Sequence, residues 1–137
     1  MSADGGNPTQ VTTQGGSMAI ESPDGRFLYS AKVAPASTTA IWRVPVGGGE
    51  ERFIVGGLSD DLNFAVAKDG LYFLAVGDAQ NKTSIDYFEF KTGKRSTLLK
   101  LDKFWWYGMA LSPDQQSLLY SVVDSAGSNL MLVDHFH

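Results

Sequence analysis

The chain has 137 residues, of which 43% are hydrophobic and 19% charged, and this composition is typical of one globular domain with a substantial core. A formal net charge of −4 without any basic block argues against binding to nucleic acid or to an anionic membrane surface, and no apolar run approaches the roughly 20 residues of a membrane-spanning helix. The absence of cysteine excludes disulfides and thiolate catalysis, and the polar N-terminus predicts no signal peptide, which leaves the cytoplasm and the periplasm both open.

The first clear pattern is a turn sequence that recurs along the chain. Three aspartates, Asp24, Asp69 and Asp114, are spaced by 45 residues, and each lies between two apolar segments. The same spacing relates two further sets of residues, Ile20, Ala65 and Ala110, and Trp42, Tyr87 and Leu132. A period of this length indicates one supersecondary unit repeated three times.

Each repeat predicts short β-strands joined by hairpin turns. Asp and Gly in the turns and Val, Ile, Leu, Phe and Tyr between them are the residue types that hairpins and strands favour. The predicted strands are 17–22, 26–33, 40–46 and 52–57 in the first repeat, 63–67, 71–77, 84–90 and 96–101 in the second, and 107–112, 117–123 and 129–136 in the third. The stretch 87–101 has some helical character, but Gly93 and the repeat frame favour a hairpin there.

Four-stranded units of about 40–45 residues are typical of the blades of a β-propeller. The sequence therefore predicts an all-β fold of three blades, with the first blade at 18–59, the second at 60–103 and the third at 104–137. The third blade lacks its own fourth strand, and residues 1–17 hold an additional strand of that type before the first blade.

The turn and the strand after it also resemble a known repeat. "SPDGRFLYSAK" with the later "IWRVPVGGG", and "DGGNPTQVT" at the N-terminus, are similar to the WD-like repeats of TolB-type bacterial β-propellers. The resemblance covers essentially the whole chain, with Lys68 where proline is usual and Gln115 where glycine is usual. It implies a propeller fold, whereas its functions range from periplasmic binding scaffolds to sensor halves of regulators and lids of peptidases.

The unmatched strands at the two ends predict a ring made by two copies. Residues 4–17 parallel residues 47–59, so that a strand over Thr9, Gln10, Val11 and Thr12 would complete the third blade of a partner. The open edge that it would pair with comprises Leu130, Met131, Leu132 and Val133. Three blades do not close a ring, whereas two copies would make six blades and bury more than about 2,000 Å². The alternative is that the blades belong to a longer single-chain propeller.

The segment 103–109, "KFWWYGM", is the best candidate for a ligand site. Lys103, Trp105, Trp106 and Tyr107 would lie near the rim of the central channel, where aromatic rings can stack on a sugar, a peptide or a base. The alternative is that these rings fill the space between blades or at the seam of the dimer.

No catalytic or cofactor-binding residues are expected. Asp134, His135 and His137 have the residue types of a metal site, but a frayed terminus is the better interpretation, because a zinc hydrolase needs three preorganised ligands and a general base. The adjacent pairs Asp60–Asp61 and Glu50–Glu51 are expected to be solvated, and the three repeated aspartates to stabilise turns. The chain is therefore expected to be a non-enzymatic binding scaffold that forms a homodimer. The alternative is a propeller module of a larger bacterial protein, either a peptidase-associated domain or the sensor half of a transcriptional regulator.

Overall fold

The structure is a computed structural model that describes residues 5–8, 10–33, 38–77 and 82–125. These residues form strands and turns without any helix, as the sequence predicts. The ten strands are β1 (Ala19–Glu21), β2 (Phe27–Val33), β3 (Thr39–Pro45), β4 (Arg52–Leu58), β5 (Phe64–Val66), β6 (Gly70–Ala75), β7 (Ser84–Glu89), β8 (Arg95–Lys100), β9 (Trp105–Leu111) and β10 (Leu118–Val122).

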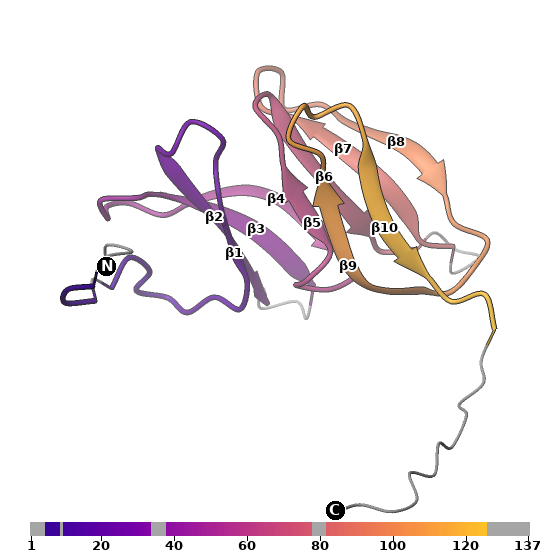
Figure 1. Ribbon diagram of the computed structural model, residues 1–137, viewed down its shortest axis with the longest axis horizontal. Helices are drawn as coiled ribbons and strands as arrows, with labels where there is room; N and C mark the ends of the chain where they lie inside the picture. The colour runs from indigo at the N-terminus through magenta and orange to yellow at the C-terminus, as the bar shows by residue number, and fades with distance from the viewer. Residues whose placement is uncertain (1–4, 9, 34–37, 78–81, 126–137) are drawn as a thin grey trace, which may run out of the picture.

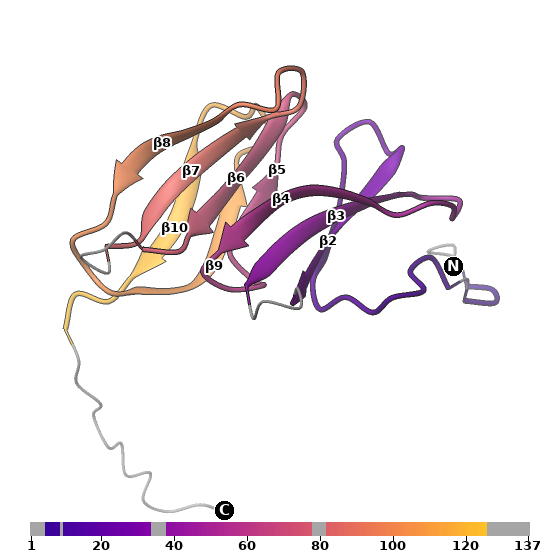
Figure 2. The same ribbon diagram turned by 180° about the vertical axis from the view of Figure 1, so that it is seen from behind.

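The strands form three antiparallel units in chain order. The first unit pairs β1 to β4 in sequence, the second unit pairs β5 to β8, and the third unit is the β9–β10 hairpin. A single pair, Leu58 with Ala75, joins β4 to β6, so the first two units form one strongly curled sheet. The short strand β5 contacts both β1 and β9, and the two opposite views agree in placing the units side by side (Figures 1 and 2). This arrangement is consistent with part of a β-propeller.

The hydrophobic core lies between the units. Because successive side chains of a strand point to opposite faces, β6 contributes to two clusters. Leu71, Phe73 and Ala75 pack toward the first unit, whereas Tyr72 and Leu74 pack toward the third. We call the face of a unit that is directed at the next unit along the chain its forward face, and the opposite one its rear face. Each unit is therefore stabilised mainly by its neighbours.

The turns of the first and third units have the same hydrogen bonds. Ser22 Oγ donates to Asp24 Oδ1 at 2.6 Å and accepts from the amide of Phe27, and Ser112 bonds in the same way to Asp114 and to the amide of Ser117. These bonds, the serine hydroxyl first among them, hold the pKa of both aspartates below the ordinary value. The expectation that Asp24 and Asp114 stabilise turns is confirmed.

The position after the aspartate requires a left-handed backbone in both of these turns. Gly25 has φ 69°, and Gln115 in the equivalent place has φ 60°, which is unique among the non-glycine residues that the structure describes. The side chain of Gln115 accepts a hydrogen bond from the amide of Lys68 at 2.9 Å. This contact between the turns of the second and third units offsets part of the conformational strain of the left-handed glutamine.

The turn of the second unit differs from the prediction. The amide of Ala67 donates to the carbonyl of Gly70. This bond leaves a turn of only Lys68 and Asp69, two residues shorter than the turns of the first and third units. No serine precedes Asp69 at the position of Ser22, so the expectation that Asp69 has the same role as Asp24 is wrong.

The shorter turn also changes which residues of β3 and β7, the third strands of the first two units, are equivalent. Tyr29 lies between Ile20 and Arg43, and the equivalent Tyr72 lies between Ala65 and Tyr87. Tyr87 is therefore equivalent to Arg43 rather than to Trp42, which lies one residue earlier. The 45-residue frame survives because loops compensate for the shorter turn, but it does not give exact equivalence within the strands.

Gly70 is required at the start of β6 because the second unit is closely packed there. A Cβ atom at Gly70 would lie 2.4 Å from the carbonyl oxygen of Phe88 and 2.5 Å from the ring of Tyr87. We predict that Gly70→Ala lowers the free energy of unfolding by about 1–3 kcal/mol, because backbone and ring must both move. Gly47→Ala is the matched control, since a Cβ there meets nothing within 4 Å. Urea denaturation of the two variants measures the difference, and equal midpoints would contradict this account of β6.

The predicted hairpin after β7 is confirmed. Gly93 has φ 67°, and the amide of Glu89 donates to the carbonyl of Lys94, so that a short turn rather than a helix joins β7 to β8. Residues 10–17, which include most of the strand predicted in the N-terminal segment, form no strand in the single chain. The predicted strand at 129–136, with Leu130, Met131, Leu132 and Val133, lies outside the described residues, as does Thr9.

Candidate functional site: an aromatic ridge at the start of β9

The four residues from Phe104 to Tyr107, which we call the aromatic ridge, lie where the chain enters the third unit. Trp105 anchors them, because its ring packs against the core between the second and third units. Its indole Nε1 donates a hydrogen bond to Thr83 Oγ1 at 3.1 Å, just before β7. An indole with a packed ring and a satisfied N–H is a fixed support for its neighbours.

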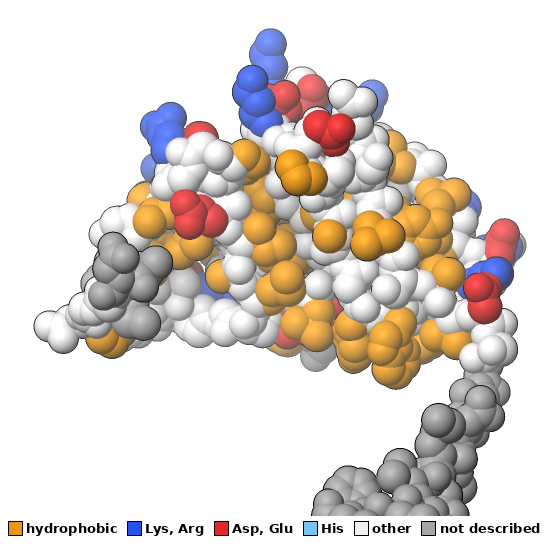
Figure 3. Space-filling model, viewed as in Figure 1, with side chains coloured by type: hydrophobic (Ala, Val, Ile, Leu, Met, Phe, Trp, Pro, Cys, Tyr) orange, Lys and Arg blue, Asp and Glu red, His pale blue; other side chains and the backbone are white. Residues whose placement is uncertain are grey.

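The other three aromatic side chains of the ridge are exposed. The exposed fractions are 64% for Phe104, 56% for Trp106 and 53% for Tyr107. Phe104 stacks on Trp105 with 5.9 Å between ring centroids and 8° between planes, and Trp106 lies 5.5 Å from Tyr107. In Figure 3, hydrophobic side chains gather along the lower edge of the molecule, over the start of β9. Contiguous exposed aromatic surface of this kind is typical of binding sites.

Lys103 lies at one end of the ridge and is paired. Its ammonium group forms an ion pair with Asp124, which follows β10, and this carboxylate raises the pKa of Lys103. Both side chains are well exposed, so the pair contributes little to stability and can open to a ligand. A cavity of about 260 Å³ lies beside the pair. Its lining includes Thr83, Asp102, Lys103, Phe104 and Trp105.

The structure therefore groups the residues that the sequence singled out, but in two roles. Trp105 is largely structural, as the alternative interpretation has it, whereas Trp106 and Tyr107 present their rings to solvent. Phe104, Thr83 and Asp124 also belong to this surface. Nothing in the sequence marked Thr83 and Asp124, because each is about 20 residues away and reaches the ridge only through strand pairing.

A second cavity lies between the turns of the first two units and has a volume of about 320 Å³. Its lining includes Asp24, Phe27, Tyr29, Arg43, Lys68 and Asp69. The guanidinium of Arg43 lies 4.3 Å from the ring centroid of Phe27, and burial raises the pKa of Tyr29. Its charged groups are mixed in sign, so this cavity favours no class of ligand.

One carboxylate of each adjacent pair considered from the sequence has a structural role. Asp60 accepts from the amides of Leu62 and Asn63, and the buried side chain of Asn63 accepts from the amide of Gly108 in β9. The expectation that Glu50 and Glu51 are both solvated is wrong for Glu51, whose side chain is only 8% exposed. Glu51 forms an ion pair with Lys32.

The described residues contain no group of three or more side chains suited to hold a metal ion. Asp134, His135 and His137 lie outside those residues. The part of the chain that the structure describes contains no helix with the length and apolar character needed to cross a membrane. Comparison with family models, with curated proteins and with solved structures finds no match for this chain.

Proposed function

We propose that this chain is a non-enzymatic binding scaffold, a three-unit arc of a TolB-like β-propeller that closes into a six-unit ring with a second copy. The aromatic ridge is the surface that such a ring presents to a protein or small-molecule ligand. Three observations support this proposal, and they concern the inner strands, the forward face of the third unit and the N-terminal segment.

The inner strands and the core have the organisation that a propeller needs. The first strands of the three units, β1, β5 and β9, lie next to one another, and the two hydrophobic clusters lie between units rather than within them. In a propeller the first strand of each blade lines the central channel, and each blade packs face to face on the next. A unit at the end of an open arc therefore lacks part of its core.

The single observation that carries the proposal is the exposure of Leu119. Tyr29, Tyr72 and Leu119 occupy the same register position on the forward faces of the three units, opposite Ile20, Ala65 and Ala110. Tyr29 is 2% exposed and stacks on Phe90 of the second unit at 5.3 Å, and Tyr72 is half-buried. Leu119 is 73% exposed, beside an open cavity of about 340 Å³ on β9–β10. The third unit therefore has a forward face suited to receive another unit.

The N-terminal segment supports the other half of the proposed joint. Ser17 donates both its amide and its hydroxyl to the carbonyl of Ala31 in β2, and Ser59 makes the same two bonds to Leu74 in β6. Ser59 directly follows β4, the fourth strand of the first unit. Residues 10–17 therefore approach the first unit in the way that β4 approaches the second, as expected for the fourth strand of a preceding unit.

Light scattering combined with a variant of the exposed face tests this proposal. We predict that the wild-type mass is twice 14.8 kDa, and that Leu119→Asp reduces it to 14.8 kDa, because a carboxylate would be buried in the joint. Leu98→Asp is the matched control, since Leu98 is 55% exposed on the outer strand β8 and should leave the mass unchanged. A stable wild-type monomer that tolerates Leu119→Asp would contradict ring closure and would favour blades of a longer propeller.

A further inference from the structure

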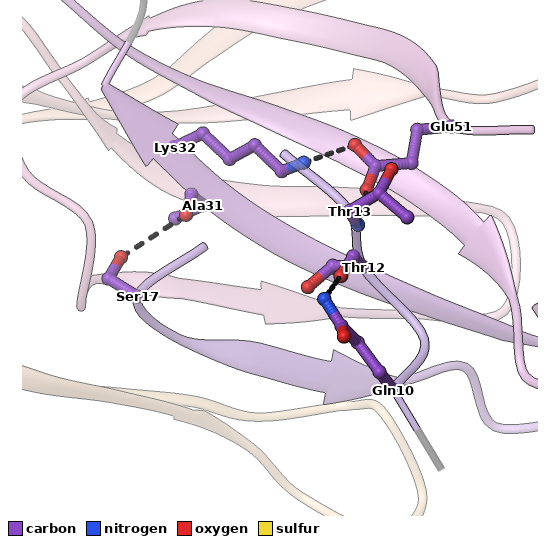
Figure 4. Close-up of polar contacts among 7 residues, drawn as sticks. All are labelled: Gln10, Thr12, Thr13, Ser17, Ala31, Lys32 and Glu51. Atoms are coloured by element: carbon purple, nitrogen blue, oxygen red, sulfur yellow. Dashed lines mark hydrogen bonds and ion pairs between the residues drawn. The ribbon is translucent and has the colours of Figure 1, made fainter. Parts of the chain in front are cut away.

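A buried ion pair on the rear face of the first unit holds the main chain of the N-terminal segment. The ammonium group of Lys32 in β2 pairs with the carboxylate of Glu51, and the two side chains are 9% and 8% exposed (Figure 4). The other carboxylate oxygen of Glu51 accepts from the amide of Thr13 at 3.1 Å. Lys32 Nζ also lies 5.8 Å from the ring centroid of Trp42 in β3. The carboxylate of Glu51 is thus held by Lys32 of β2, and Lys32 in turn lies beside β3.

The second unit has a comparable arrangement, in which a positive side chain, Arg95, takes the place that the negative Glu51 has in the first unit. Arg95, the first residue of β8, pairs with the buried carboxylate of Asp86 at 2.6 Å and donates to the carbonyl of Gly56 in β4 at 3.2 Å. Glu51 directly precedes β4, the corresponding fourth strand of the first unit. In the first and second units, an ion pair with a buried carboxylate on the rear face therefore bonds the main chain of the strand or segment that comes before that unit.

We propose that Lys32 and Glu51 form a receptor for the main chain of an incoming strand, and that this receptor presents residues 10–13 for strand addition by a second copy of the chain. The receptor holds the segment through Thr13 while Ser17 fixes its end on β2. The identity of the partner rests on the ring closure proposed above, whereas the binding of the segment to the receptor does not.

The groups around Glu51 determine the pH range in which the receptor binds the N-terminal segment. Lys32 faces the carboxylate from β2, the amides of Thr13 and Gln14 face it from the N-terminal segment, and the flanking Glu50 and Arg52 pair with one another. The bond from Lys32, followed by those from the two amides, lowers the pKa of Glu51 from its ordinary value of 4.5. The stabilisation that the charged Glu51 provides is therefore complete above the ordinary pKa and is lost as the pH falls through the lowered one. The receptor thus holds the N-terminal segment at neutral pH.

Hydrogen exchange of the full chain at neutral pH tests the receptor directly. We expect Glu51→Gln to speed the exchange of the amides of Thr13 and Gln14 several-fold, since the neutral amide is a weaker acceptor. Glu50→Gln is the matched control, because Glu50 is exposed and should leave this exchange within about twofold of wild type. Equal exchange in the two variants would overturn the proposal.

A second variant distinguishes loss of the receptor from loss of the fold. Lys32→Met with Glu51→Met replaces the pair by apolar side chains of similar volume, a change that buried pairs often tolerate. We expect exchange of the amides of Thr13 and Gln14 to increase about tenfold or more, while amides of β6 and β7 keep their protection. Unchanged exchange of these two amides in a folded double variant would also overturn the receptor.

The mass of the same variants tests whether the receptor contributes to strand addition between two copies of the chain. If residues 10–13 are presented by the receptor, the double variant should shift the light-scattering mass toward 14.8 kDa, whereas Glu50→Gln should not. Faster exchange with an unchanged dimer would support the receptor but overturn its role in strand addition. A monomeric wild type would overturn ring closure, and the exchange experiment would still decide on the receptor.

Discussion

Phe64→Ala should lower the free energy of unfolding by about 3–5 kcal/mol, the largest effect that we expect from any single core substitution. Phe64 is the first residue of β5 and is 0% exposed. It belongs to the cluster between the first and second units, so its removal leaves a cavity at the joint between them. Because β5 is only three residues long, its short backbone pairing compensates little for this loss.

Thermal denaturation measures this effect, since about 1 kcal/mol corresponds to roughly 4 °C in a domain of this size. We expect Phe64→Ala to lower the Tm by about 12–20 °C. Phe53→Ala is the matched control, because Phe53 is 56% exposed and has one edge contact, at 5.6 Å, with Trp42. Its loss should not exceed about 1.5 kcal/mol. Equal losses in the two variants would contradict a core that lies between the units.

The turns illustrate what the sequence alone could establish. The bonds from Ser22 to Asp24 and from Ser112 to Asp114 lie within a few residues of the chain, so the sequence motif is sufficient to predict them. The alternation of apolar residues in β6 likewise follows from local pattern, because both of its faces are buried. These short-range features account for the success of the all-β prediction.

The second unit shows where such reasoning fails. The sequence aligned Asp69 with Asp24 because both precede a glycine, yet Gly70 does not have the left-handed backbone of Gly25. Gly70 instead lets β6 approach Tyr87 and Phe88 closely, and that contact depends on residues 17 and 18 positions away. The shorter turn is thus determined by packing across the sheet, which no local motif records.

The buried ion pairs were missed for the same reason. Lys32 and Glu51 are 19 residues apart, and Asp86 and Arg95 are separated by a hairpin. Charged residues in strands and turns read as solvated when each is considered alone. Their burial follows from which face of the sheet they share, so only the register identifies them. The same holds for Asp124, which reaches Lys103 through the pairing of β9 with β10.

Arg95→Met should cost about 3 kcal/mol in the free energy of unfolding, because it leaves a buried carboxylate without its charged partner. The side chain of Asp86 is 4% exposed, and after the change the hydroxyl of Ser84, at 2.7 Å, is the one donor to it that remains among the described residues. We place the loss at the lower end of the range for buried pairs because the side chain of Arg95 is 38% exposed. The bond from Arg95 to the carbonyl of Gly56 in the first unit is lost as well.

A double-mutant cycle separates the pair from simple loss of packing. Lys94→Met is the matched single control, since Lys94 is exposed in the turn before β8 and its loss should stay within about 0.5 kcal/mol. Adding Asp86→Ala to Arg95→Met removes the uncompensated charge and should restore part of the stability, so the double variant should be more stable than Arg95→Met alone. Urea denaturation measures all four states of the cycle. If the second substitution costs further stability instead, Asp86 is not held by charge, and the rear face of the second unit owes its stability to packing alone.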